Sequence, residues 1–338
     1  MTQPAPGVTP DLFWETMTGF QRSAVLKTAV DLEIFTKIGE GNSTAGDIAT
    51  ACDASERGVR IICDSLATMG FLTKSGSQYA MTDSTAAFLD KKSQAYLGSA
   101  LDFILSPQQR RGFDDLTNAA RKGGSSITGD ASMDPDSQMW VTFARAMAPL
   151  MFPMAQMMAG HLDLPTDREI KILDIAAGHG IYGIMAGQKY PNARIYGADW
   201  GNVLTVAQEN AAKFGLGDRY HTIPGNAFES DFGTGYDAIL VPNFFHHFDV
   251  ETCETFIRKL DASLVDDGKI VTVEFVPHED RISPPTSAMF AVVMLAATPS
   301  GDAYTFAEFK KMFENSGFSK NTLISLEPMP SHLIISEH

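Results

Sequence analysis

An apolar run that ends in a glycine-rich loop constrains the fold of this chain more than any other feature. Residues 170–175 (IKILDI) form this run, which is typical of a strand buried in a parallel sheet. Gly178 and Gly180 follow it and let the backbone approach a ligand closely. A second expected strand, 193–198, delivers Asp199 at its carboxyl end, the edge at which open α/β sheets bind ligands. The sequence therefore predicts a nucleoside-binding site at this edge.

The identity of the nucleoside depends on the charges beside the loop. Gly178, Gly180 and Gly183 also fit the dinucleotide pattern G-x-G-x-x-G, so NAD and FAD compete. However, Asp174 lies four residues before Gly178, at the end of the strand. It would repel a pyrophosphate, whereas it suits a ligand that carries an ammonium and a sulfonium. The pattern also lies far from the N-terminus, while dinucleotide enzymes often place it in their first βαβ unit. S-adenosylmethionine is therefore favoured, and Asp199 would bind its ribose as it would bind that of NAD.

Length and composition exclude several classes of protein. A chain of 338 residues has room for two domains. A formal net charge of −15 argues against nucleic acid as a partner. Three cysteines are too few and too scattered for a disulfide framework or a zinc site. Residues 1–10 lack the apolar core of a secretory signal, and the longest apolar helical run, 287–297, is too short to span a bilayer. We expect a cytoplasmic protein with no membrane partner.

The N-terminal third has the order of elements of a winged helix. We expect an amphipathic helix over 11–38, a capped helix over 43–52, a second helix over 56–69 and a small hairpin within 71–81. In a DNA-binding regulator the second helix would carry several basic or amide residues. Acidic residues balance its two arginines here, which favours a packing or dimerisation module over a regulator.

Two further helical stretches precede the predicted ligand-binding domain. The first covers 94–122, and the second covers 136–162, is rich in methionine and aromatic residues, and should be kinked by Pro149 and Pro153. Such a methionine stripe either fills a core or lines an adaptable apolar pocket. From Glu169 onward strands and helices alternate, with further strands expected over 220–224, 236–241 and 269–276, which predicts a doubly wound parallel sheet.

Two histidines follow the fourth expected strand of this sheet, at the same edge as the glycine loop. His246 is placed to take a proton from a hydroxyl. Glu274 ends the next expected strand, so it should lie beside His246 and stabilise its protonated form. Packing or capping roles for these residues remain open, as does a metal site that combines His246 and His247 with His278 or Glu274. No tight ligand spacing supports the metal site, and we expect none.

Together these motifs resemble the small-molecule O-methyltransferase family that includes plant caffeate-type and acetylserotonin-type enzymes and many bacterial homologues. The resemblance covers residues 11–338 and rests on the following motifs: 174–180 (DIAAGHG), Asp199, 225–228 (GNAF), 245–248 (FHHF), 267–268 (DG), 273–277 (VEFVP), 294–296 (MLA) and 304–309 (YTFAEF). In that family a histidine is the catalytic base and a glutamate 28 residues later supports it. Here 274 − 246 = 28, so the resemblance implies His246 and Glu274 as catalytic residues.

The resemblance also implies a fold and a division of the chain. A Rossmann-like class I methyltransferase domain, 166–338, would follow a helical, winged-helix-like dimerisation domain, 1–93, and connecting helices, 94–165, would partly line the substrate pocket. A homodimer through the N-terminal helices is expected.

The cofactor contacts that the resemblance implies come from the ends of four expected strands. Gly178 would approach the methionine part of S-adenosylmethionine, Asp199 its ribose and Trp200 its adenine. Asn226 stands where many members have an aspartate that reaches the adenine amino group. The full expected set is Asp174, Gly178, Gly180, Asp199, Trp200, Asn226, Ala227, Phe228 and Asn243.

Two departures from the family pattern concern the catalytic residues. His247 replaces the aspartate that commonly follows the catalytic histidine. The second supporting glutamate of the plant enzymes falls near Ala303, and Asp302 or Tyr304 could take over part of its role.

We therefore expect O-methylation of a small hydroxylated acceptor, aromatic or polyketide-like, that leaves S-adenosylhomocysteine. The sequence leaves C- or N-methylation open, as well as a hydroxylase, decarboxylase or pericyclase on the same scaffold.

Overall fold

The computed structural model describes residues 9–127 and 137–338, which form two compact units. The first unit runs to Leu101 and the second begins at Asp102. Residues 1–8 and the expected helix start at Asp136 lie outside the described residues. Within the described part of the chain, no helix combines the length and the apolar character needed to cross a membrane.

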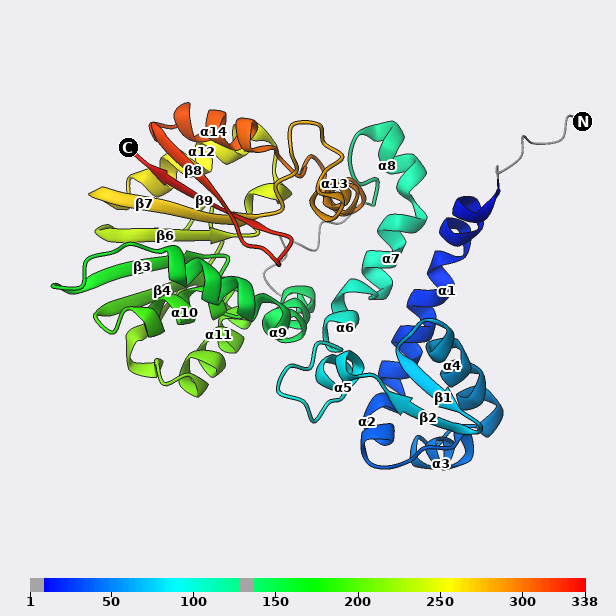
Figure 1. Cartoon of the computed structure of the whole chain (residues 1–338). Coiled ribbons are helices and arrows are strands. Elements are labelled where there is room, and N and C mark those ends of the chain that lie inside the picture. The colour runs from blue at the N-terminus through cyan, green and yellow to red at the C-terminus, as the bar shows by residue number, and fades with distance from the viewer. Residues whose placement is uncertain (1–8, 128–136) are drawn as a thin grey trace, which may run out of the picture. The chain divides into compact units, whose positions relative to one another are not determined.

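The first unit has the predicted helix, turn, helix and hairpin (Figure 1). Its elements are α1 Asp11–Asp31, α2 Ile34–Gly39, α3 Ala45–Ala51, α4 Glu56–Thr68, β1 Leu72–Ser75, β2 Gln78–Met81 and α5 Asp83–Leu89. Thr44 and Ser55 cap α3 and α4 with their side-chain oxygens, as their positions predict. The prediction of one helix over 11–38 is wrong, because Glu33 adopts a left-handed conformation with φ of 56° and separates α1 from α2.

A series of helices connects the first unit to the sheet. These are α6 Ala100–Ile104, α7 Pro107–Asp114, α8 Leu116–Lys122 and α9 Gln138–His161. The prediction of one helix over 94–122 is wrong, because Pro107 has no amide hydrogen to continue the preceding turn and instead begins α7 behind the cap Ser106. By contrast, α9 retains Pro149 and Pro153 inside one helix.

The second unit is built on a sheet of seven strands in the order β5-β4-β3-β6-β7-β9-β8. The strands are β3 Ile170–Ile175, β4 Ala193–Asp199, β5 Tyr220–Pro224, β6 Tyr236–Pro242, β7 Leu264–Glu274, β8 Lys320–Ser325 and β9 His332–Glu337. Strands β3 to β7 are parallel, as the alternation predicts. Strand β9 pairs antiparallel with both β7 and β8. The predicted strand over 269–276 begins five residues earlier, at Leu264.

The helices of this unit follow the strands in the doubly wound manner. They are α10 Ile181–Lys189, α11 Gly201–Lys213, α12 Val250–Asp261, α13 Pro285–Ala297 and α14 Phe306–Glu314. Strand order runs outward from β3 to β4 in one direction and from β6 to β7 in the other (Figure 1). Because such crossovers are right-handed, α10 and α12 cover opposite faces of the sheet. The direction reverses between β3 and β6, and ligands bind at this switch point.

Close packing under the glycine loop depends on a glycine within β4. A Cβ built on Gly197 would lie 2.4 Å from Oη and 3.0 Å from Cζ of Tyr220. Asp174 pairs with Gly197 across the two strands, so the Asp174 side chain and the missing Cβ point to the same face of the sheet. The tyrosine ring therefore occupies the space that a side chain at position 197 would need.

We expect Gly197→Ala to destabilise the fold by about 1–3 kcal/mol, because it overpacks a rigid core contact. Gly217→Ala is the matched control, since a Cβ there would meet nothing within 4 Å. Urea unfolding followed by circular dichroism measures both variants, and equal midpoints would contradict the packing argument.

Candidate active site

The loop between β3 and α10 has an unusual backbone conformation that depends on its glycines. Ala176, Gly178 and Gly180 all have left-handed conformations, with φ of 48°, 56° and 72°. A Cβ on Gly178 would have no neighbour nearer than 3.7 Å, whereas one on Gly183 would lie 2.9 Å from Oδ2 of Asp174. Gly178 therefore leaves room for a ligand, and Gly183 lets α10 pack tightly on the sheet.

Two carboxyl groups lie beneath this loop. Asp174 is fully buried, and its Oδ2 accepts a hydrogen bond of 3.0 Å from the amide of Gly183, while Oδ1 has no partner among the described residues. Asp199 accepts from the amides of Gly178 at 2.8 Å and Trp200 at 2.6 Å. Burial raises the pKa of Asp174 to about 8 and the pKa of Asp199 to about 6. Both groups would regain their ordinary ionisation beside a cation, so this site suits a positively charged ligand.

The expected adenine-side residues lie at the carboxyl ends of β4 and β5. Trp200 packs with Trp140 and Val203 in an apolar cluster, which places it between α9 and α11. Oδ1 of Asn226 accepts from the amide of Phe228 at 3.0 Å. The Phe228 ring packs 4.9 Å from that of Phe256, so Phe228 belongs partly to the core. The carbonyl of Ala227, between them, accepts from Lys259 at 2.9 Å.

The end of β6 bends sharply toward α10. Asn243 has φ of 52°, and its Nδ2 donates to Oη of Tyr182 at 3.3 Å. Its backbone amide donates to the carbonyl of Val273 at 2.8 Å on the neighbouring strand. This bend starts the short 3-10 turn Phe245–His247, which places both histidines above the end of β7.

His246 and Glu274 form a buried pair, as the neighbouring strand ends predict. Nδ1 of His246 lies 2.5 Å from Oε2 of Glu274, and the His246 amide lies 3.4 Å from Oε1. The residues are only 5% and 1% exposed. A buried carboxylate accepts a hydrogen bond from the imidazole at this distance, so Nδ1 carries the hydrogen and Nε2 carries the lone pair. This is the arrangement of a base with an orienting carboxylate.

His247 contacts the other nitrogen of the same imidazole. Its Nε2 lies 3.2 Å from Nε2 of His246, and its ring meets the edge of Trp140 with centroids 5.8 Å apart. Burial lowers the pKa of His247 well below its usual value, and neighbouring His246 lowers it further. His247 is therefore neutral near pH 7.

Aromatic side chains surround these groups. Phe143 belongs to the stretch 136–162 that the sequence offered as core or pocket lining, whereas Phe290 was not singled out. Phe290 of α13 packs at a steep angle to His246, with ring centroids 4.8 Å apart, and stacks on Phe275 with centroids 4.1 Å apart. Phe143 of α9 stacks on His179 of the glycine loop at 6.3 Å. Periodicity alone marks Phe143 and Phe290 only as apolar helix positions. By contrast, four methionines of α9 are buried core residues, namely Met147, Met151, Met154 and Met158.

The segment around Ala303 packs against the turn Phe245–His247. A Cβ on Gly301 would lie 2.1 Å from the carbonyl oxygen of His246, so this segment packs directly on the histidine backbone. Tyr304 donates its hydroxyl to the carbonyl of Phe248 at 2.6 Å. Asp302 pairs with Arg281 at 3.2 Å. In the described structure these contacts hold the loops around the site and do not involve the imidazole of His246.

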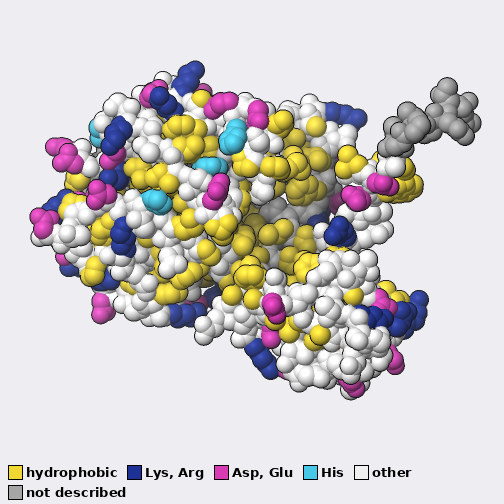
Figure 2. Space-filling view, viewed as in Figure 1, with side chains coloured by type: hydrophobic (Ala, Val, Ile, Leu, Met, Phe, Trp, Pro, Cys, Tyr) yellow, Lys and Arg dark blue, Asp and Glu magenta, His cyan; other side chains and the backbone are white. Residues whose placement is uncertain are grey.

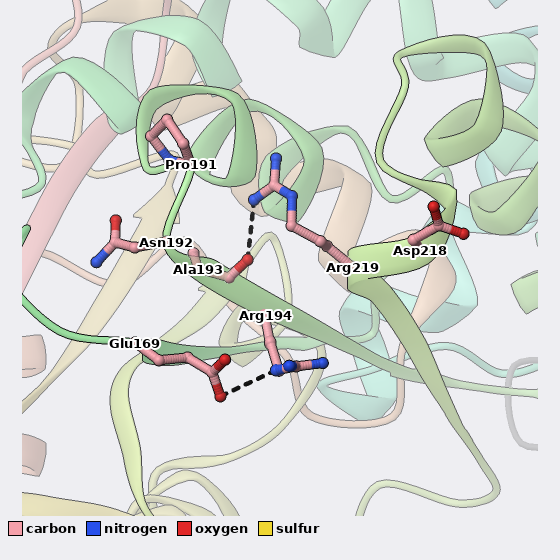
Figure 3. Close-up of a pocket in the computed structure, with 7 residues that line it drawn as sticks. All are labelled: Glu169, Pro191, Asn192, Ala193, Arg194, Asp218 and Arg219. Atoms are coloured by element: carbon pink, nitrogen blue, oxygen red, sulfur yellow. Dashed lines mark hydrogen bonds and ion pairs between the residues drawn. The ribbon is translucent and has the colours of Figure 1, made fainter.

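A surface pocket lies at the opposite edge of the sheet, near the amino ends of β3 and β4. Figure 3 shows its lining: Glu169, Pro191, Asn192, Ala193, Arg194, Asp218 and Arg219. Arg194 pairs with Glu169 at 2.9 Å, and Arg219 donates to the carbonyl of Ala193 at 2.9 Å. Both cations are engaged by the protein, and none of the residues predicted for the site lies here.

The chain matches the domains of a known protein family. Residues 135–319 match the O-methyltransferase domain, and residues 14–91 match the O-methyltransferase dimerisation domain. The 3-hydroxy-5-methyl-1-naphthoate 3-O-methyltransferase of Streptomyces sahachiroi is 24% identical over 92% of this chain and 90% of its own length. The crystal structure of a candidate O-methyltransferase from Nostoc punctiforme is 46% identical over 100% of both chains, with a TM-score of 0.93. Human N-acetylserotonin methyltransferase in complex with SAM is 18% identical, has a TM-score of 0.85 and shares the fold over 99% of both chains.

The buried carboxyl of Asp174 makes a pH-dependent prediction. Its folded pKa, about 8, lies above its usual 3.8, so its protonation stabilises the protein fully below pH 4 and this contribution is lost as the pH rises through 8. Asp174→Asn keeps an acceptor for Gly183 but cannot ionise. In the ligand-free protein, its melting temperature should rise relative to the parent between pH 4 and pH 8. Differential scanning fluorimetry measures this, with exposed Asp218→Asn as control, and a parent more stable than Asp174→Asn at pH 8 would refute it.

Proposed function

The chain belongs to the O-methyltransferase family, and from this membership we propose that it methylates a hydroxyl group of a small aromatic or polyketide-like acceptor. Its methyl donor is S-adenosylmethionine. The curated relatives support the acceptor class, because they include methyltransferases named for a hydroxynaphthoate and for tetracenomycin polyketide synthesis. A relative named for C-methylation, the L-tyrosine C(3)-methyltransferase of Streptomyces lavendulae, matches only 45% of this chain. The two O-methyltransferases match 92% and 91% of it, so O-methylation is the better supported chemistry.

The residues under the glycine loop fit the cationic donor. The orphaned Oδ1 of Asp174, the raised pKa values of both carboxyl groups and the open space at Gly178 all favour a ligand with positive charge. We assign Asp174, Gly178 and Gly180 to its methionine part and Asp199 to its ribose. The adenine side is then formed by Trp200, Asn226, Ala227 and Phe228, and Asn243 lies at the end of β6 between the two halves of the site.

The buried pair of His246 and Glu274 is the observation that supports a hydroxyl group as the acceptor. When bound, S-adenosylmethionine supplies an electrophilic methyl group. The protein has to hold the acceptor oxygen against it and remove the hydroxyl proton. His246 is the proton's destination, because Glu274 at 2.5 Å compensates the positive charge that the imidazole then acquires.

The test of this function is a screen of the purified protein with S-adenosylmethionine against phenols, enols and hydroxy acids. We expect formation of S-adenosylhomocysteine that depends on a hydroxyl group, together with a methyl ether product seen by mass spectrometry. Product methylated on carbon or nitrogen, from hydroxyl-bearing and hydroxyl-free acceptors alike, would refute it.

His246→Ala should lower turnover by about 10²–10⁴-fold, the usual contribution of a general base, and leave cofactor affinity nearly unchanged. Asp199→Ala is the complementary variant, since it removes a cofactor contact and should weaken binding first. Rates of S-adenosylhomocysteine formation and isothermal titration calorimetry separate the two effects. Full turnover in His246→Ala would remove His246 from the mechanism.

We also propose that the protein forms a homodimer through α1. This helix exposes large apolar side chains that a water-exposed helix does not need: Leu12 at 78%, Phe13 at 61%, Trp14 at 53%, Met17 at 46% and Phe20 at 71%. Figure 2 shows hydrophobic side chains near the N-terminal end of α1. Phe13, Met17 and Phe20 share one face at helical spacing, and a contiguous exposed apolar face is typical of an interface.

Met17→Glu with Phe20→Glu should convert the dimer to a monomer, because two charges would be buried at the interface without partners. Arg22→Glu is the control, since position 22 lies on the opposite face of α1. Sedimentation velocity at micromolar concentration measures all three proteins. A monomeric parent, or a double variant that stays dimeric, would contradict the assignment.

A further inference from the structure

The nitrogen that a direct base would use is already occupied in this structure. Because Nδ1 of His246 donates to Glu274, its Nε2 carries the only free lone pair of the ring. Nε2 of His247 lies 3.2 Å from that atom. Two lone pairs cannot share a hydrogen bond, so Nε2 of His247 carries the hydrogen. The remaining lone pair of this histidine couple is then on Nδ1 of His247.

The exposure of the two histidines also indicates that an acceptor contacts His247 first. His246 is only 5% exposed and lies beneath Phe290 and His247. His247 is half-buried, and among the described residues no hydrogen bond engages its Nδ1. A hydroxyl that approaches the couple therefore meets His247 before His246.

We propose that His247 receives the proton of the acceptor hydroxyl and passes its own proton to His246. This inference rests on the proposed function. The O–H bond breaks and an N–H bond forms at Nδ1 of His247. At the same time the N–H bond at Nε2 of His247 breaks and a new one forms at Nε2 of His246. The electron pair stays on the acceptor oxygen for its bond to the methyl carbon, while the electrons of the broken C–S bond remain on sulfur.

The direction of this transfer follows from the surroundings of each ring. The pKa of His247 lies well below its usual value because the ring is desolvated beside another imidazole, so a proton is not stable on His247 alone. On His246 the same proton produces an imidazolium, and the carboxylate of Glu274 lies 2.5 Å from Nδ1 of that ring. Relay through a neutral His247 thus ends where a counter-charge is present.

Backbone and ring contacts fix the positions of the two imidazole rings relative to each other. Besides its contact with the carbonyl of His246, a Cβ on Gly301 would lie 2.9 Å from the carbonyl carbon of His247. The turn Phe245–His247 therefore has little room to move, and Trp140 limits the ring of His247 from the side. A relay needs such fixed geometry, since proton transfer requires hydrogen-bonded distances.

The first experiment needs no acceptor. Nitrogen-15 NMR of the full-length protein labelled at histidine, with signals assigned through His246→Gln and His247→Phe, reports which ring nitrogens carry hydrogen. We expect hydrogen on Nδ1 of His246 and on Nε2 of His247. Hydrogen on Nδ1 of His247 would overturn the proposal.

The second experiment measures turnover with hydroxyl acceptors from the screen and ring-substituted analogues of graded acidity. His247→Phe should lose about 10²-fold or more with an un-ionised phenol and far less with a nitrophenol that is already ionised, at unchanged cofactor affinity. A merely structural role would lower both rates equally and so overturn the proposal. His221→Phe, a half-buried histidine on β5 that packs on Tyr196, is the matched control and should retain full turnover.

The two hypotheses fail in different ways. If no hydroxyl is methylated by the parent protein, the proposed function fails, while NMR still decides the order of the tautomers. If the parent methylates a phenol and His247→Phe keeps its rate within about threefold, far below the usual contribution of a general base, only the relay fails and His246 acts directly.

Discussion

The buried carboxyl of Asp174 is the constraint around which the ligand-binding half is arranged. Its hydrogen bond to the Gly183 amide fixes the start of α10 over the sheet, and the contact is possible only because position 183 has no side chain. The same burial leaves Oδ1 without a partner in the described structure and makes its ionisation unfavourable. A protein tolerates such a group where a bound cation compensates it. With the proposed cationic donor in place, the stability lost without ligand would become binding free energy.

The parts of the site that sequence reasoning could predict are those fixed by strand order. His246 and Glu274 follow neighbouring parallel strands, and β6 does pair with β7, so their proximity follows from topology. The family and its cofactor could also be identified from the residues, because the glycine loop, Asp199 and the spacing of 28 residues occur together.

Tertiary packing decides the parts that could not be predicted. Phe290 reaches His246 from α13, and Gly301 packs on the histidine backbone, although neither position differs in pattern from its neighbours. The helix over 11–38 is interrupted at Glu33, a residue with ordinary helix propensity whose left-handed conformation the sequence does not indicate. Local patterns specify which elements form, and the contacts between them specify where those elements end and which side chains meet.

The charges of the two halves of the site are complementary to the proposed reaction. On the donor side the buried carboxyl of Asp174 is assigned to the cationic part of the proposed donor, and Asp199 is assigned to its ribose. On the acceptor side Glu274 already has a hydrogen-bonded imidazole, and His247 is held neutral. As a methyl group leaves a sulfonium, positive charge disappears from the donor side, and as a hydroxyl loses its proton, positive charge appears on His246. Glu274 is therefore needed in the transition state more than in the resting protein, which is the condition for an interaction to accelerate the step and not merely to bind the ground state.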